Sequence, residues 1–107
     1  MSEEIGDRDF DKKVLERSKQ LPVIVDFYAD WCMPCKTLEP ILEKIAEEYG
    51  DRLVLVKVNV NNAPENTQKY RILSIPNVKI FKDGKVVDEF IGSLPENKVR
   101  EWLEKNL

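Results

Sequence analysis

Histidine is absent from this sequence of 107 residues, and cysteine occurs only twice. The lack of histidine excludes Ser-His-Asp and Cys-His catalytic centres. Two cysteines are too few for a closed zinc site, which needs four ligands, so only a site shared in a dimer or completed by carboxylates would hold zinc here. Any cysteine chemistry of this chain therefore depends on Cys32 and Cys35 alone.

The chain also lacks an excess of positive charge and any long apolar run. Its net charge is −3 and both signs are scattered along it, which leaves no basic stripe for a nucleic-acid backbone. The apolar stretches fall far short of the roughly 18 residues that a membrane span needs. The N-terminus is acidic and lacks the apolar segment of a signal peptide. We therefore expect a cytoplasmic protein that binds neither nucleic acid nor membrane.

Charged residues make up 35% of the chain, above the roughly 25% of an average soluble domain, and the excess is mostly Lys and Glu. This bias is typical of proteins from very hot environments, which suggests the hypothesis of a thermophilic source. A chain of this length buries enough surface to fold as one domain, residues 1–107, without disulfides or metals.

Helical patterns occur in four segments. They are indicated by apolar residues at helical spacing, by residues that commonly cap helices, or by both. The predicted helices are 9–17 with Asp9 as a cap, 32–49 with a kink at Pro40, 62–70 with Asn62 as a cap, and 93–107 with a capping box from Ser93 to Glu96. Trp102 lies on the apolar stripe of the last helix, so we expect it in the core.

Strand patterns occur in three segments. Runs rich in β-branched residues cover 22–29 and 52–60, and the first is too continuously apolar to have an exposed face. The segment 77–92 is predicted to be two strands joined through Asp83 and Gly84, a strong hairpin signal. Elements in the order β-α-β, α, hairpin, α predict an α/β fold, a mixed sheet with helices on both faces.

Cys32 and Cys35 lie where the run 22–29 has ended and the helix 32–49 begins. Residues i and i+3 share a helix face, so the two sulfurs can meet. Unpaired N–H groups at the helix start stabilise an anion, which favours a thiolate at Cys32. A covalent staple across so short a loop would add little stability. A redox pair is therefore favoured over a zinc site or a staple.

The two cysteines should have different roles in disulfide exchange. Cys32, at the exposed start of the turn, would attack a substrate disulfide, and Cys35, one turn deeper, would resolve the mixed disulfide. Pro34 fits the first turn because it lacks an N–H that would have no partner there.

Asp26 and Lys57 are each the lone charge within a β-rich run. If Asp26 is buried, its pKa is raised, which would suit it to take a proton from the deeper thiol. The alternative is a side chain that points into solvent or into an ordinary salt bridge. An ion pair between Asp26 and Lys57 on neighbouring strands would explain both charges.

Trp31 and Met33 flank Cys32, and large apolar side chains beside a nucleophile indicate a docking surface for polypeptide. Core packing is the alternative for both. Pro76 precedes a strand, and the base rate for X-Pro bonds favours an ordinary trans proline there.

The segments VDFYADWCMPCK and IPNVKIFKDGK, with Gly92 and a closing amphipathic helix, resemble the thioredoxin family from about Phe10 to Leu107. The resemblance implies the thioredoxin fold, with a central mixed sheet of four to five strands, and protein-disulfide reductase activity. It also implies a redox carrier without a bound cofactor, which a separate thioredoxin reductase, NADPH-linked or ferredoxin-linked, reduces again. We expect a monomer whose other partners are protein disulfides.

The resemblance also implies roles for individual residues. Cys32 corresponds to the nucleophile, Cys35 to the resolving thiol, and Asp26 to a buried acid that assists Cys35, with Lys57 beside it. Pro76 corresponds to a cis-proline, contrary to the base rate. The docking surface would consist of Trp31, Met33, Pro34, Ile75, Pro76, Ile91 and Gly92, with Ile75 offering backbone hydrogen bonds to an extended substrate.

The sequence departs from the family at several positions. Met33 replaces the usual Gly between the cysteines, where the residue type affects the reduction potential. Asn77 replaces the usual Thr, and Arg71 and Ser74 stand where glycines are common; these positions lie near the docking groove, so the resemblance leaves the choice of partner open. The N-terminal segment offers only Ile5 for apolar contact, so the family's first edge strand should be short or missing.

Two other functions compete with that of a redox carrier. One is a specialised isomerase or dedicated reductant whose potential is tuned by Met33. The other is a non-catalytic binding subunit that uses the apolar surface around Cys32. A reduction potential measured against glutathione separates the carrier from the specialised isomerase or reductant. Full function in a Cys32→Ser variant would favour the non-catalytic binding subunit.

Overall fold

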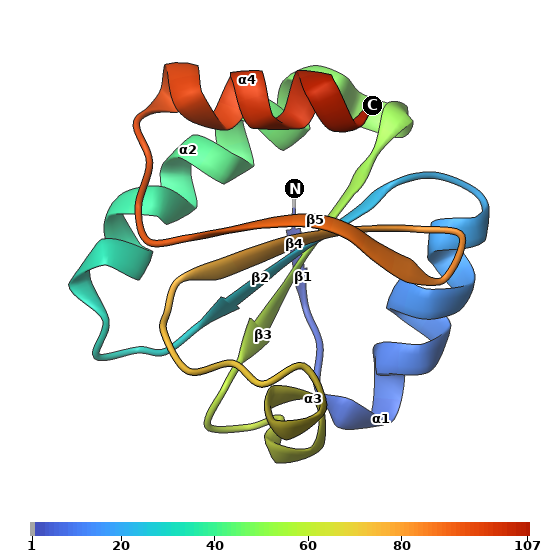
Figure 1. Ribbon diagram of the computed structural model, residues 1–107, viewed down its shortest axis with the longest axis vertical. Helices are drawn as coiled ribbons and strands as arrows, with labels where there is room; N and C mark the ends of the chain where they lie inside the picture. The colour runs from blue at the N-terminus through green and yellow to red at the C-terminus, as the bar shows by residue number, and fades with distance from the viewer. Residues whose placement is uncertain (1) are drawn as a thin grey trace.

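The computed structural model describes residues 2–107, which contain one five-stranded mixed sheet in the order β1-β3-β2-β4-β5 (Figure 1). The strands are β1 (Ser2–Glu4), β2 (Val23–Tyr28), β3 (Val54–Asn59), β4 (Asn77–Lys82) and β5 (Lys85–Ile91). β3 runs parallel to β1 and β2, and β4 runs antiparallel to β2 and β5. The predicted mixed sheet is confirmed, and its first edge strand is formed but short.

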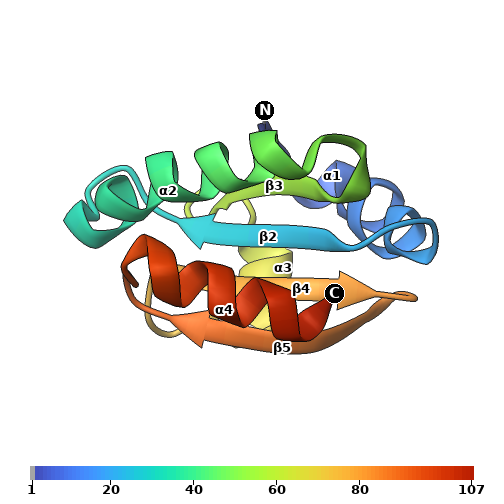
Figure 2. The same cartoon turned by 90° about the horizontal axis from the view of Figure 1, so that it is seen from above.

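Helices cover both faces of this sheet, as predicted. They are α1 (Asp7–Phe10), α2 (Met33–Tyr49), α3 (Pro64–Lys69) and α4 (Glu96–Asn106). After α1 the chain continues in wider π-helical turns over Asp11–Glu16 and a tight 3-10 turn over Arg17–Lys19. α2 and α4 lie on one face, with α4 over β4 and β5, while α1 and α3 lie on the other (Figures 1 and 2).

The alternation of side chains along β2 divides the core into two layers. Val25 and Phe27 pack with Phe10 and other residues on the α1 side, whereas Ile24 packs with residues such as Leu38 on the α2 side. The run 22–29 was expected to be covered on both faces, and every β2 residue before Tyr28 is buried. The α2 side also contains Trp102, which lies edge-on to Phe90 at 4.9 Å, so its predicted core position is confirmed.

The predicted side-chain caps are wrong. α1 begins two residues before Asp9, α3 follows Ala63 rather than Asn62, and α4 follows Pro95 rather than Ser93, all without a cap hydrogen bond from the cap residue's own side chain. For α4 the reason is local: the Pro95 carbonyl accepts the backbone N–H groups of Lys98 and Val99 at 3.0 and 3.1 Å, so the helix starts there.

Asp7 caps α3 from a distant part of the chain. Its carboxylate accepts the backbone N–H groups of Glu65 at 2.9 Å and Asn66 at 3.0 Å. It also accepts the side-chain amide of Asn66 at 2.7 Å. These bonds satisfy helix N–H groups that local residues leave free, and they join α1 to α3 on the same face of the sheet.

The hairpin predicted at Asp83 and Gly84 is confirmed. Both residues have positive φ, 54° and 80°, as a two-residue turn between twisted strands requires. Ser18 holds this turn against the helical segment that follows α1. Its carbonyl accepts the Asp83 N–H at 2.9 Å and its hydroxyl accepts the Gly84 N–H at 2.7 Å.

Candidate active site

Cys32 and Cys35 lie at the junction that the sequence predicted. β2 ends at Tyr28, and Cys32 is the N-cap residue of α2 with an extended backbone, φ −95° and ψ 107°. Pro34 lies in the first turn, where its missing N–H costs nothing. The two cysteines are joined by a disulfide, and the Cys35 N–H donates to the Cys32 sulfur at 3.1 Å.

The position of Cys32 determines the charge state that its sulfur favours when reduced. The sulfur takes the place that an oxygen occupies in an ordinary N-cap, where it accepts a helix N–H. α2 is 17 residues long, so the positive end of a long helix dipole also lies at this sulfur. Both effects stabilise a thiolate at Cys32, the species that attacks a disulfide.

The exposure expected for Cys32 is wrong. Cys32 is 4% exposed and Cys35 is 3% exposed. The disulfide packs against Ala29 and against the half-buried side chains of Tyr28, Val60 and Ile75. The sequence places Ile75 far from the cysteines, so this cover comes from the tertiary fold. A reacting partner can reach only a small part of the Cys32 sulfur.

Trp31 and Met33, in contrast, project from the surface. Trp31 is 71% exposed and Met33 is 67% exposed, which excludes core packing for either. Pro34 is exposed beside them. Three sequence neighbours of Cys32, two of them large and apolar, are thus exposed while Cys32 itself is nearly covered.

The segment that ends at Pro76 forms another border of the site. The Ile75–Pro76 peptide bond is cis, as the family resemblance implied and against the base rate. Ile75 packs against the cysteine cluster, and the Pro76 carbonyl accepts the Gly92 N–H at 2.8 Å. Ile91, at the end of β5, is exposed. Ile75, Pro76 and Gly92 are therefore brought together at this border, and Ile91 precedes Gly92 at the end of β5.

Asp26 is a buried acid in the middle of β2. It is 2% exposed and is paired with Lys57 on β3 and Val78 on β4 in the strand register. Within residues 2–107 its Oδ1 atom has no hydrogen-bond partner. Burial raises the pKa of Asp26 to about 7, although the charge of Lys57 opposes the rise; the charges of Glu39 and Glu43 add to it.

The predicted ion pair between Asp26 and Lys57 is wrong. The Lys57 ammonium instead forms a salt bridge with Glu39 on α2 and lies 4.5 Å from the centre of the Tyr28 ring. Glu39 is considerably more exposed than Asp26, so a charge pair there loses less hydration. Lys57 is thus next to Asp26 along the sheet, while its charge is bound elsewhere.

A cavity of about 340 Å³ leads from the surface to Cys35. Besides Cys35 its walls include Glu39, Lys57, Tyr28 and Asp30, together with Ala29 and Lys36. The Tyr28 hydroxyl donates to Glu4 on β1. Burial is the main cause that raises the pKa of Tyr28, and Glu4 adds to the rise. Sequence reasoning missed Glu39 and Tyr28. A signal for Glu39 was available, because its spacing of four residues from Cys35 places Cys35 and Glu39 on one face of α2.

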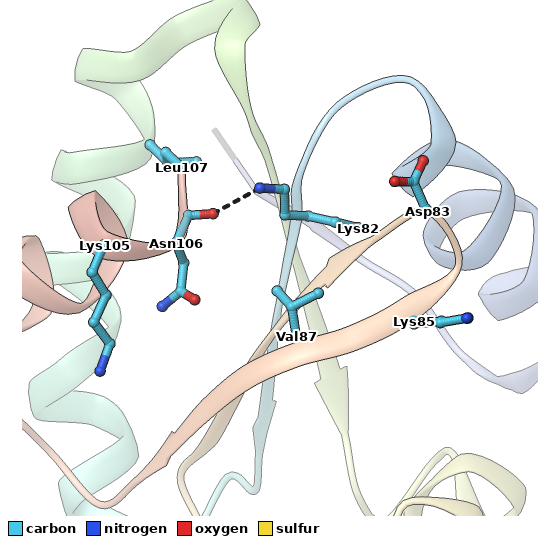
Figure 3. A pocket seen from close by; sticks show the side chains of 7 residues that line it. All are labelled: Lys82, Asp83, Lys85, Val87, Lys105, Asn106 and Leu107. Carbon is cyan, nitrogen blue, oxygen red and sulfur yellow. Dashed lines mark hydrogen bonds between the residues drawn. The ribbon is translucent and has the colours of Figure 1, made fainter.

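A second cavity lies at the hairpin end of β4 and β5 (Figure 3). Three lysines, Lys82, Lys85 and Lys105, line it, and the Lys82 ammonium donates to the Asn106 carbonyl at 3.0 Å. It contains neither a cysteine nor a buried acid, so it is not the candidate site.

In the described part of the chain no three His, Cys, Asp or Glu side chains form a group that could hold a metal ion. No helix within residues 2–107 is both long and apolar enough to span a membrane.

Comparison with known proteins gives one consistent result. The family model "Thioredoxin" matches residues 2–105. "Thioredoxin 1" of Synechococcus elongatus is 42% identical over 103 residues, covering 96% of this chain and 94% of that protein. "Thioredoxin" of Rickettsia bellii is 38% identical over the full length of both chains, and that of Rhodospirillum rubrum is 38% identical over 97% of this chain and 98% of its own. These relatives give no support to the hypothesis of a thermophilic source.

Proposed function

This chain belongs to the thioredoxin family, and from that premise we propose that Cys32 and Cys35 carry its protein-disulfide reductase activity as nucleophile and resolving thiol. The family assignment makes the protein a thiol-disulfide oxidoreductase with the thioredoxin fold. The roles of the single residues rest on the geometry of the site. The observation that carries them is the position of Cys32 at the N-cap of α2, with the Cys35 N–H bonded to its sulfur.

In the first step the Cys32 thiolate attacks one sulfur of the substrate disulfide. The bond between the two substrate sulfurs breaks, a bond between Cys32 and the substrate forms, and the other substrate sulfur leaves as a thiolate. The helix start favours Cys32 over Cys35 for this step, because Cys32 is the N-cap residue, where the positive end of the α2 dipole stabilises the negative charge.

In the second step Cys35 resolves the mixed disulfide. Its thiol first loses a proton to the Asp26 carboxylate, and the resulting thiolate attacks the Cys32 sulfur. The disulfide of the protein forms again, and the second substrate thiolate leaves. Two electrons have passed to the substrate, whose thiolates take up one proton from Asp26 and one from water. Lys57 assists as a nearby positive charge that opposes the rise in the pKa of Asp26, not as an ion-pair partner.

The substrate binds on the apolar border of Cys32. Trp31, Met33 and Pro34 form one side of this docking surface, and Ile75, Pro76, Ile91 and Gly92 form the other. An extended substrate segment lies beside Ile75 and takes backbone hydrogen bonds from it, in the manner of an added strand. The exposure of Trp31 and Met33 supports this role, since a monomer gains nothing by placing two large apolar side chains in water.

The chain works as one domain and a monomeric carrier in the cytoplasm. A separate thioredoxin reductase, linked to NADPH or to ferredoxin, returns the Cys32–Cys35 disulfide to the dithiol state. No dinucleotide-binding fingerprint occurs in the sequence, so the protein depends on that partner for electrons.

A trapping experiment tests the two cysteine roles. Chemically reduced wild type, Cys32→Ser and Cys35→Ser are each mixed with a protein disulfide substrate, and products are resolved by mass spectrometry. We expect turnover for wild type, a stable mixed disulfide through Cys32 for Cys35→Ser, and neither for Cys32→Ser. If Cys32→Ser formed the mixed disulfide instead, the roles would be reversed; if it reduced substrate as fast as wild type, the catalytic proposal would be wrong.

A further inference from the structure

One face of α2 carries a cysteine and two glutamates at intervals of about one turn. Cys35, Glu39 and Glu43 follow one another at a spacing of four residues, which places them along the side of the helix that meets β1 and β3. Glu39 binds Lys57 on β3, and Glu43 accepts the hydroxyl of Ser2 on β1 at 2.6 Å. The helix that carries the resolving cysteine thus also carries the anion that binds Lys57.

Lys57 has two acids within its surroundings and is bonded to one of them. Asp26 is its register neighbour on β2, but the ammonium is bonded to Glu39, above the ring of Tyr28. Asp26 is left with an Oδ1 atom that has no hydrogen-bond partner in the described chain. The salt bridge to Glu39 is therefore formed at the expense of one to Asp26.

Glu39 and Lys57 also line the cavity that leads to Cys35. The salt bridge therefore lies in the wall of the same cavity as the cysteine that must lose a proton. A change in the position of the Lys57 ammonium would alter the electrostatic surroundings of both Cys35 and Asp26.

We propose that Glu39 is a positioning residue of the reductase reaction: by holding the Lys57 ammonium on the α2 side of the cavity, it keeps Asp26 without a direct cationic partner and able to exchange a proton with Cys35. This inference rests on the proposed transfer of the Cys35 proton to Asp26. A carboxylate paired with an ammonium is a poor proton acceptor at neutral pH, because the pair stabilises its charged form. A carboxyl that titrates near the working pH is the better acid and base.

All charged groups that face Asp26 enter this balance. Lys57 comes from β3, and Glu39 and Glu43 come from α2, while the β4 neighbour of Asp26 is the apolar Val78. Lys57 lowers the pKa of Asp26, and Glu39 and Glu43 raise it, with burial as the largest cause of the net rise. Loss of Glu39 removes one raising charge and frees Lys57 to approach Asp26, so both consequences act in the same direction.

The test follows the titration of the Asp26 carboxyl carbon by NMR in the oxidised protein, which needs no activity. We expect a midpoint near 7 in wild type and a fall of about one pH unit in Glu39→Gln, a tenfold change in proton affinity. Glu47→Gln removes the same charge from an exposed position two turns further along α2 and should leave the midpoint in place.

A double variant separates the two routes by which Glu39 could act. If Glu39 acts through Lys57, the shift caused by Glu39→Gln should fall to less than half in a Lys57→Met background. An equal shift in both backgrounds would mean that Glu39 acts by its own charge alone, and would overturn the inference. An Asp26 titration midpoint that did not move in Glu39→Gln would also overturn the inference.

The pH profile of substrate reduction by the prereduced protein links this titration to Cys35. The midpoint of the profile should move with that of Asp26 in Glu39→Gln, and a profile that stayed at the wild-type midpoint would overturn the inference. Failure of the proposed function has a different signature, because Cys32→Ser would then reduce substrate as fast as wild type whatever Glu39 does.

Discussion

Replacing Asp26 by Asn should stabilise the protein at alkaline pH and leave it nearly unchanged in acid. The carboxyl of Asp26 lies in the middle of the sheet, 2% exposed, with one oxygen lacking any hydrogen-bond partner in the described chain. In the ionised form this charge is poorly solvated, and Lys57 is bonded to Glu39 instead. An asparagine has nearly the same shape and never carries the charge.

The magnitude follows from the pKa. Burial raises the pKa of Asp26 from 3.8 to about 7 in the folded protein. Between these values the unfolded chain has released the proton while the folded protein retains it, so wild-type stability falls as pH rises through this window. Each pKa unit corresponds to about 1.4 kcal/mol, so a pKa that is higher by about three lowers the free energy of unfolding of the wild type by about 4 kcal/mol at pH 8. The advantage of Asp26→Asn should therefore be near zero at pH 4 and reach about 4 kcal/mol above pH 7.

Urea unfolding of the oxidised proteins at several pH values between 4 and 8.5 measures this difference. Asp51→Asn, which neutralises an exposed carboxylate in the turn after α2, is the matched control and should show no comparable gain with pH. A difference between Asp26→Asn and wild type that stayed constant with pH would refute the reasoning, since it would mean that Asp26 titrates alike in the folded and unfolded chains.

Two further predictions concern the face of the sheet opposite α2. Asp7→Ala should cost about 1 to 2 kcal/mol of the free energy of unfolding, because α3 loses its distant cap. Faster hydrogen exchange at the Glu65 and Asn66 amides should accompany this loss. Unchanged exchange at these two amides would contradict the capping role. Phe10→Ala should cost about 3 to 5 kcal/mol of the free energy of unfolding, because the Phe10 ring is fully buried among aromatic neighbours that include Phe81, with 5.9 Å between ring centres. A cost under about 1 kcal/mol would show that the site collapses around the smaller side chain.

Much of the fold could be predicted because its signals are local. The continuous apolar run of β2 reflects burial on both faces, and the Asp83-Gly84 pair supplies the positive φ values that a tight hairpin needs. The cysteine pair at a helix start was equally visible, because the spacing of i and i+3 brings the sulfurs together on any helix.

The errors concern contacts between distant parts of the chain. The caps predicted from neighbouring residues were wrong at α3, because Asp7 reaches it across 58 positions of sequence. Cys32 was expected to be exposed, but Ile75 covers it from a loop that no local pattern relates to the cysteines. Lys57 was assigned to Asp26 because both are lone charges in strands, whereas the more exposed Glu39 binds it.

The two tryptophans lie in opposite surroundings, and this makes each an optical reporter of a different event. Trp31 is exposed beside the disulfide, so its emission should respond to reduction of that bond and to a polypeptide that covers it. Trp102 is 7% exposed and packed edge-on against Phe90, so its emission should change only when the α2 side of the core opens. Single-tryptophan variants would therefore let docking and unfolding be followed separately by fluorescence in one protein, without an added label.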